Sequence, residues 1–234
     1  KWDPIIGLEV HAQVSTKTKM FCGCVNKYGD FPNKNTCPTC LGLPGALPVV
    51  NKTAIDYAIK LGLSVGSKIT KFSRFARKNY FYPDLTKGYQ ISQYDEPICE
   101  GGKIIIRFDN NIKSIQLTRI HLEEDAGKSI HSNNNLGTEV DFNRCGVPLV
   151  EIVSEPVIKS GEEAKSYLTR LKQILEYLNI CDCNLEKGNL RCDANVSIRP
   201  KGQKEFGTKT ELKNMNSFRG VERGINSEIE SLNI

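Results

Sequence analysis

The chain has 234 residues, of which 39% are hydrophobic and 25% charged, and its formal net charge is +5. This composition excludes a disordered chain and predicts one large globular domain or two small ones. No apolar run approaches the about 18 residues of a membrane-spanning helix, and no signal-peptide pattern is present, so we expect a soluble protein with no membrane partner. The small positive charge is compatible with a phosphate-rich partner but does not establish one.

The first predicted element is a strand over residues 8–14, where apolar and polar side chains alternate. Its polar face carries Glu9, His11 and Gln13. A loop rich in Gly, Pro and Cys follows at residues 22–48. Asn51 is then a helix cap, and the apolar spacing after it predicts a helix that ends near Gly66.

In the middle of the chain, the sequence pattern predicts mainly strands. Residues 103–108 and 112–122 form a predicted hairpin, joined through residues 109–111, and further strands are predicted at 139–142 and 149–153. A loop is predicted at residues 133–135. Ser160 opens a capping box, and the apolar positions from Ala164 to Leu178 predict an amphipathic helix after it.

Two more strands are predicted before the end of the chain. Residues 190–199 alternate with Arg191 and Asp193 on the polar face, and residues 206–213 place Lys209, Glu211 and Lys213 on one side. Because strands outnumber helices and several are joined by short turns, we predict an α+β fold, a mostly antiparallel sheet backed by helices. We expect the functional site on the polar face of this sheet.

Four cysteines form two close pairs, Cys22 with Cys24 and Cys37 with Cys40. Two thiolate pairs at such spacing are typical of a tetrahedral zinc site, which here would be structural and would stabilise the loop at 21–41. The tight first pair leaves a redox dithiol or plain buried cysteines as alternatives. Nine cysteines, most of them scattered, favour a reducing compartment such as the cytoplasm over a disulfide framework.

A second group of candidate ligands consists of carboxylates with an imidazole, spread along the chain. Such a set suits Mg²⁺ bridging ATP phosphates, although solvated or ion-paired carboxylates and a structural histidine would leave the same pattern. Glu123 and Glu124 must point to opposite faces if their segment is extended, so at most one joins the site. The members are Glu9, His11, residues 121–125, Glu151 and Asp193.

Two further patterns concern phosphate binding. Residues 127–129 (GKS) resemble the tail of a phosphate loop, but Leu122 stands where that loop needs its first glycine, so we do not expect a Walker motif. Residues 74–82 interleave cations with aromatic rings, which suits phosphate binding with base stacking and equally suits a buried aromatic strand.

Six blocks along almost the whole chain resemble the B-subunit family of the glutamyl/aspartyl-tRNA amidotransferase, which we favour over the archaeal E paralogue that shares several of them. The blocks are IGLEVH at 6–11, RKNYFYPD at 77–84, HLEEDAGK at 121–128, VDFNRCGVPLVEI at 140–152, LRCDAN at 190–195 and ELKNMNSF at 211–218.

The resemblance implies a cradle-shaped catalytic domain over residues 1–234, similar to the catalytic half of glutamine synthetase. It also implies a ligase reaction in which Mg-ATP phosphorylates the side-chain carboxylate of Glu-tRNA(Gln) or Asp-tRNA(Asn). Ammonia from the partner amidase (A) subunit then displaces the phosphate, and a small C subunit completes the complex in the cytoplasm or an organellar matrix. Because the sequence stops inside a helical pattern, we interpret the domain as incomplete at its C-terminus, without the family's helical and tail domains.

Position by position, the resemblance implies that His11, Glu124 and Glu151 hold Mg²⁺, and that Glu9, Glu124 and Asp193 are the acidic catalytic positions. The expected nucleotide-binding residues are Arg77, Lys78, Tyr80, Arg191 and Lys209. Two alternatives from other classes stay open: a zinc-stabilised RNA-binding module without catalysis, and a small-molecule ligase of the glutamine synthetase type.

Overall fold

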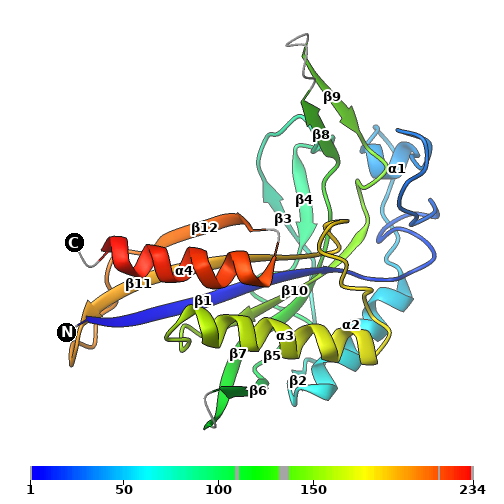
Figure 1. Ribbon diagram of the computed structural model, residues 1–234. Coiled ribbons are helices and arrows are strands. Elements are labelled where there is room, and N and C mark those ends of the chain that lie inside the picture. Colours follow the sequence, from blue (N-terminus) through cyan, green and yellow to red (C-terminus); the bar gives the residue numbers. More distant parts are fainter. Residues whose placement is uncertain (1, 109–110, 132–136, 216, 233–234) are drawn as a thin grey trace.

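The computed structural model describes residues 2–108, 111–131, 137–215 and 217–232. Within these residues an eight-stranded sheet, antiparallel at every pairing, runs in the order β12-β11-β1-β10-β7-β5-β2, with β6 also paired to β7 (Figure 1). Its strands are β1 (Trp2–Gln13), β2 (Lys68–Ile69), β5 (Cys99–Glu100), β6 (Lys103–Phe108), β7 (Asn111–Glu124), β10 (Pro148–Ser154), β11 (Leu190–Pro200) and β12 (Thr210–Met215).

Two small hairpins and four helices complete the described fold. The hairpins pair β3 (Ala76–Asn79) with β4 (Tyr89–Ser92) and β8 (Lys128–His131) with β9 (Thr138–Asp141). The helices are α1 (Pro38–Leu41), α2 (Lys52–Ser64), α3 (Gly161–Tyr177) and α4 (Phe218–Leu232). None of the described helices has both the length and the apolar character that a membrane crossing requires.

Helices α2, α3 and α4 pack on one face of the main sheet. Helix α4 contacts β11, α2 contacts β7, α3 contacts β6, and α3 lies beside α4 (Figure 1). The apolar residues of the alternating strands face this layer and form one buried cluster with it, including Leu8, Val10, Val150, Leu168 and Leu171. Because strand side chains alternate, the polar residues between them lie on the opposite face.

The predicted α+β fold with a mostly antiparallel sheet is therefore confirmed. Both helix starts are as expected: the Asn51 side chain accepts from the amide of Thr53 at 3.0 Å, and Ser160 accepts from the amide of Glu163 at 3.2 Å. The predicted hairpin is present as β6 and β7. Residues 109–110 of its turn, and the predicted loop at 133–135, lie outside the described residues.

The last predicted strand differs from the structure at its start. Strand β12 begins at Thr210 rather than at residue 206, because β11 continues to Pro200 and the chain needs a turn through Gly202 (φ 95°) to come back. Lys209 therefore precedes the strand and is exposed. The hairpin of β8 and β9 also includes a strand, Lys128–His131, that alternation did not indicate.

Helices α3 and α4 are so closely packed at Gly161 that a side chain there would not fit, and this close packing can be tested. A Cβ there would overlap the carbonyl oxygen of Glu222 in α4, while the Gly161 amide donates to the Asn226 side chain at 2.9 Å. We expect Gly161→Ala to lower the free energy of unfolding by about 1–3 kcal/mol, as overpacking does, although alanine is the better helix former. Urea denaturation measures this. Thr169→Ala, on the exposed side of α3, should stay within about 0.5 kcal/mol of wild type, and an equally stable Gly161→Ala would contradict the packing.

Candidate active site

A row of acidic and basic side chains crosses four strands of the sheet. His121 of β7 lies opposite Glu151 of β10, Glu151 lies opposite His11 of β1, and His11 lies opposite Arg191 of β11. Directly opposed residues in antiparallel strands have Cβ atoms about 4.5–5.5 Å apart on the same face. The register alone thus gathers four residues that are distant in sequence.

Three more acidic groups extend this row along the strands. Glu9 of β1 lies opposite Asp193 of β11, and each stands two residues from a member of the row. Glu123 stands two residues beyond His121 on β7. Since the strand period is two, all three share the face of the row. Asn195, the next residue of this face on β11, donates to the Glu9 carboxylate at 2.8 Å and so orients it.

The tightest group consists of His11, Glu123 and Glu151. His11 Nε2 lies 3.4 Å from Glu123 Oε1 and 3.3 Å from Glu151 Oε2, and the potential ligand atoms of all three lie within 4.8 Å of one another. His121 Nε2 lies 3.1 Å from the same Glu151 oxygen. Both glutamates are buried. Two carboxylates and an imidazole at these separations can hold one divalent cation.

The pKa values of this group respond to burial and mutual charge. Burial raises the pKa of Glu123, against the attraction of His11. Burial would lower the pKa of His11, but the hydrogen bond and charge of Glu151 outweigh it and raise that pKa above 6.5. Burial also works against ionisation of Glu151, yet its bonds to His11 and His121 hold its pKa below the usual range. Burial raises the pKa of Asp193.

Of the expected set of His11, Glu124 and Glu151, the structure brings His11 and Glu151 together, and the carboxylate that lies beside them is Glu123 rather than Glu124. Strand β7 stays extended to its end, so the two glutamates point to opposite faces, as alternation requires. Glu124 forms an ion pair with Lys87, accepts from the Ile91 amide at 3.0 Å, and lines a separate cavity of about 210 Å³.

The row forms the floor of a cavity of about 1080 Å³, at the upper end of small-molecule sites. Both acidic and cationic side chains line this cavity. Of the residues expected at the site, its lining includes Glu9, His11, Arg77, Lys78, Tyr80, Glu151, Arg191 and Asp193. Lys209 and Glu124 are not in the lining. Arg77 lies over the Tyr89 ring at 4.8 Å and Lys78 over the Tyr80 ring at 5.9 Å, so cations and aromatic rings lie together on the hairpin of β3 and β4 and next to it.

Several residues that line the cavity had no individual role in the sequence-based expectation. Asp125, expected only as part of the acidic run at 121–125, is a buried hub: one of its oxygens accepts from Gln13 at 2.9 Å and from Arg191 at 3.0 Å, and lies 3.7 Å from Arg144. Asp125 thereby holds two arginines at the cavity. Its acidic run is visible in the sequence, but partners so far away in the chain cannot be found by spacing. His121 and Glu123, from the same expected run, also line the cavity, and so does Arg119, which had no expected role.

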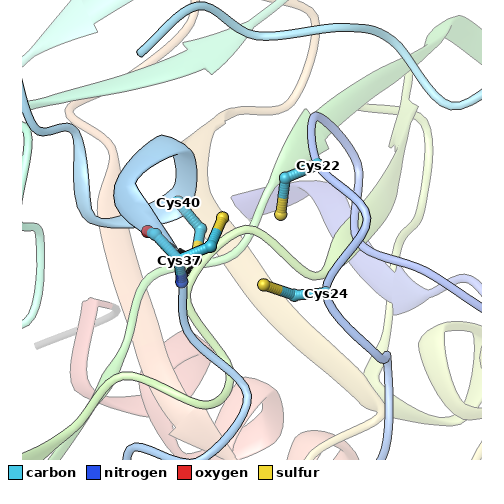
Figure 2. Close-up of side chains that lie close together, drawn as sticks. All are labelled: Cys22, Cys24, Cys37 and Cys40. Carbon is cyan, nitrogen blue, oxygen red and sulfur yellow. Dashed lines mark hydrogen bonds between the residues drawn. The ribbon is translucent and has the colours of Figure 1, made fainter. Parts of the chain in front are cut away.

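The four-cysteine cluster lies in the loop outside the sheet. Its sulfur atoms point toward one another (Figure 2) and lie within 4.8 Å of one another. Helix α1 starts with Pro38 and ends at Gly42 in the left-handed conformation (φ 71°), which turns Cys37 and Cys40 to the same point. A hydrogen bond with Cys22 and the Cys37 amide lower the pKa of Cys40 to about 4 against the effect of burial. All nine cysteines are free.

Comparison with known proteins identifies a family that matches almost the whole chain. Residues 4–233 match the family model described as the GatB/GatE catalytic domain. The chain belongs to this family. It is 58% identical over 230 residues to a protein of Thermodesulfovibrio yellowstonii and 55% identical over 232 residues to one of Carboxydothermus hydrogenoformans, both named as the B subunit of an aspartyl/glutamyl-tRNA(Asn/Gln) amidotransferase.

Both alignments cover 98% of this chain but 48% of the relative. This GatB/GatE catalytic domain therefore spans about half the length of the curated relatives that it matches. The names of these relatives agree with the resemblance to the B rather than the E subunit.

The charge coupling in this GatB/GatE domain can be measured on His11. With the chain free of metal, we expect Glu151→Gln to lower the pKa of His11, because the carboxylate that raises it is lost while burial remains. NMR measures the pKa of His11 through a pH titration of the imidazole protons. Because the chain has three histidines, few imidazole signals need to be assigned. Glu139→Gln, on exposed β9, should leave the pKa unchanged. An unchanged His11 pKa in Glu151→Gln is incompatible with the row.

Proposed function

We propose that the large cavity is the site at which ATP activates the side-chain carboxylate of a tRNA-linked glutamate or aspartate for amidation. The observation that carries this proposal is the concentration of His11, Glu123 and Glu151 on one sheet face, in a cavity that cations also line. Family membership and the names of the relatives support the choice of substrate.

Mg²⁺ fits this group, since two buried carboxylates and an imidazole offer hard ligands and leave positions for water and phosphate oxygens. The ion supplies electrostatic stabilisation of the charge that accumulates on a transferring phosphoryl group. His11, Glu123 and Glu151 would hold it. Arg77, Lys78 and Arg191 line the same cavity and would bind the phosphates of ATP.

The chain's part in the reaction is orientation and charge. A carboxylate oxygen of the substrate attacks the γ-phosphorus and ADP leaves; the nitrogen of ammonia then attacks the carbonyl carbon, and phosphate leaves with the former carboxylate oxygen. Glu9, fixed by Asn195, and Asp193 line the same cavity and can accept the protons that ammonia loses. The exposed Tyr80 ring is placed to stack on a base of ATP or of the RNA end.

The proposed reaction needs other subunits, and it gives a role to the sheet and to the cysteine cluster. Ammonia would come from the amidase (A) subunit, with the small C subunit completing the complex, in the cytoplasm or an organellar matrix where the free thiols stay reduced. The sheet with its helical backing would act as the cradle of a glutamine synthetase-like domain. The cysteine cluster would hold a structural Zn²⁺ through Cys22, Cys24, Cys37 and Cys40.

The two neighbouring glutamates provide the sharpest test of the metal assignment. In the full-length protein we expect Glu123→Gln to weaken binding of Mn²⁺, used as a probe for Mg²⁺, by more than about tenfold, because one ligand carboxylate is lost. Glu124→Gln removes the same charge from the other face and should bind Mn²⁺ as wild type does. Electron paramagnetic resonance of free Mn²⁺ measures both.

In the complete amidotransferase, Glu123→Gln should also lose tRNA-stimulated ATP cleavage and amidation while glutaminase activity of the partner persists. Full amidation in this variant would refute the proposed function. Turnover with free glutamate, or RNA binding without ATP cleavage, would instead favour one of the two alternative functions.

The zinc assignment has a separate readout in metal content. We expect close to one equivalent of zinc in the wild-type protein and a loss of it in Cys37→Ser, because three thiolates hold the ion far less firmly than four. Cys99→Ser, at a buried cysteine in β5 outside the cluster, should retain the zinc. Elemental analysis with a chelator-release assay measures this; equal zinc in both variants would exclude the cluster as the site.

A further inference from the structure

Lys19 is a lysine with no exposed surface, lying beside the cysteine cluster. Its ammonium donates to the Asn35 carbonyl at 2.6 Å and lies 3.4 Å from the Phe142 carbonyl and 3.7 Å from the Cys40 sulfur. In the described part of the chain, no carboxylate forms an ion pair with it. A buried cation without a counterion is costly, so the charge that balances Lys19 has to be sought among its neighbours.

The sulfur of Cys40 is the group next to Lys19 that can become an anion. This sulfur also accepts from the Cys37 amide at 3.2 Å, so two donors converge on it. Four thiolates around one divalent ion leave an excess of negative charge. The ammonium therefore lies where an occupied cluster would need a cation.

The local backbone keeps Lys19 in this place. The Lys19 amide donates to the Cys24 carbonyl at 3.0 Å, which joins its segment to the first cysteine pair. Gly146, in the left-handed conformation (φ 82°), allows the close approach, since a Cβ there would lie 3.3 Å from the Cys40 Cβ and 3.6 Å from the Lys19 Cδ. The backbone contacts of Lys19 and the close approach at Gly146 therefore hold this lysine beside the Cys40 sulfur.

We propose that Lys19 is the charge-compensating cation of the four-cysteine metal site, donating to the Cys40 sulfur so that the ion binds more tightly and the sulfur reacts less readily with electrophiles. The inference rests on the proposed zinc site and adds a residue outside the ligand set. Outer-shell partners of metal ligands act in this way, and their loss typically reduces metal affinity by about 10–100-fold.

The test compares loss of charge with loss of the tether. Lys19→Met removes both the charge and the hydrogen bonds to the carbonyls, whereas Lys19→Gln removes the charge but keeps a donor for the Asn35 carbonyl. Lys19→Arg keeps the charge. Lys17→Met, at an exposed lysine two residues away, is the matched control. Thermal melting establishes which variants are folded, and the comparison of Lys19→Gln with Lys19→Arg isolates the effect of the charge.

Zinc affinity of the full-length protein is measured by competition with a chromogenic chelator, and the thiols of the zinc-loaded protein are then alkylated with iodoacetamide. We expect both neutral variants to bind zinc about 10–100-fold more weakly and to be alkylated faster, and Lys17→Met and Lys19→Arg to behave as wild type.

Three results would overturn the proposal. Wild-type affinity and alkylation in Lys19→Met would exclude any role of the lysine toward the metal. Wild-type behaviour in Lys19→Gln with a defect in Lys19→Met would show a tether for the loop rather than a compensating charge. Absence of zinc from the wild-type protein would remove the metal site itself, and this failure is visible in the zinc content before any variant is compared.

Discussion

The antiparallel register of β7, β10, β1 and β11 determines where Glu9, Glu123, Glu151 and Asp193 lie. It sets His121, Glu151, His11 and Arg191 in one row, and a slip by one residue in any strand would turn that strand's members toward the helices. Burial of the opposite, apolar face against α2, α3 and α4 fixes the register. The same hydrophobic packing that stabilises the fold therefore assembles the site.

Burying several carboxylates close together costs free energy, and the neighbouring side chains offset this cost only in part. Histidines pair with Glu123 and Glu151, and Asp125 is held by side chains from β1 and β11. The raised pKa of Glu123 shows that burial and like charge still oppose its ionisation. A divalent cation between these groups would relieve that opposition, which is the physical basis of the proposed metal site.

Much of the fold could be predicted from alternation and capping. The strand at 8–14, the hairpin of β6 and β7 and the helix after Ser160 each carry a local periodic signal. The order of strands in the sheet and the start of β12 depend on long-range pairing and on turn geometry, which no window of sequence contains. The carboxylate and imidazole pattern and the resemblance indicated the residues of the site, but which of Glu123 and Glu124 lies beside His11 depends on how far β7 stays extended, and no sequence window contains that. Lys19 gave no signal in the sequence, because burial of a lysine is decided by its surroundings.

The two adjacent glutamates also show how one strand end serves two environments. Glu123 faces the large cavity, while Glu124 pairs with Lys87. Gly42 of the cysteine loop is closely packed against the side chain of that lysine. Loop and sheet are thus in direct contact next to the site. The distinct placement of these neighbours is a property of the extended backbone and does not depend on the identity of the ion.

If the register of the sheet creates a divalent-metal site on its polar face, a crystal structure of the protein with Mn²⁺ and a non-hydrolysable ATP analogue will show it most directly through the anomalous signal of the ion. We expect one peak at a coordination distance of about 2 Å from His11, Glu123 and Glu151, beside the phosphates. A peak bound by Glu124 on the opposite face, or none near His11, would contradict this expectation.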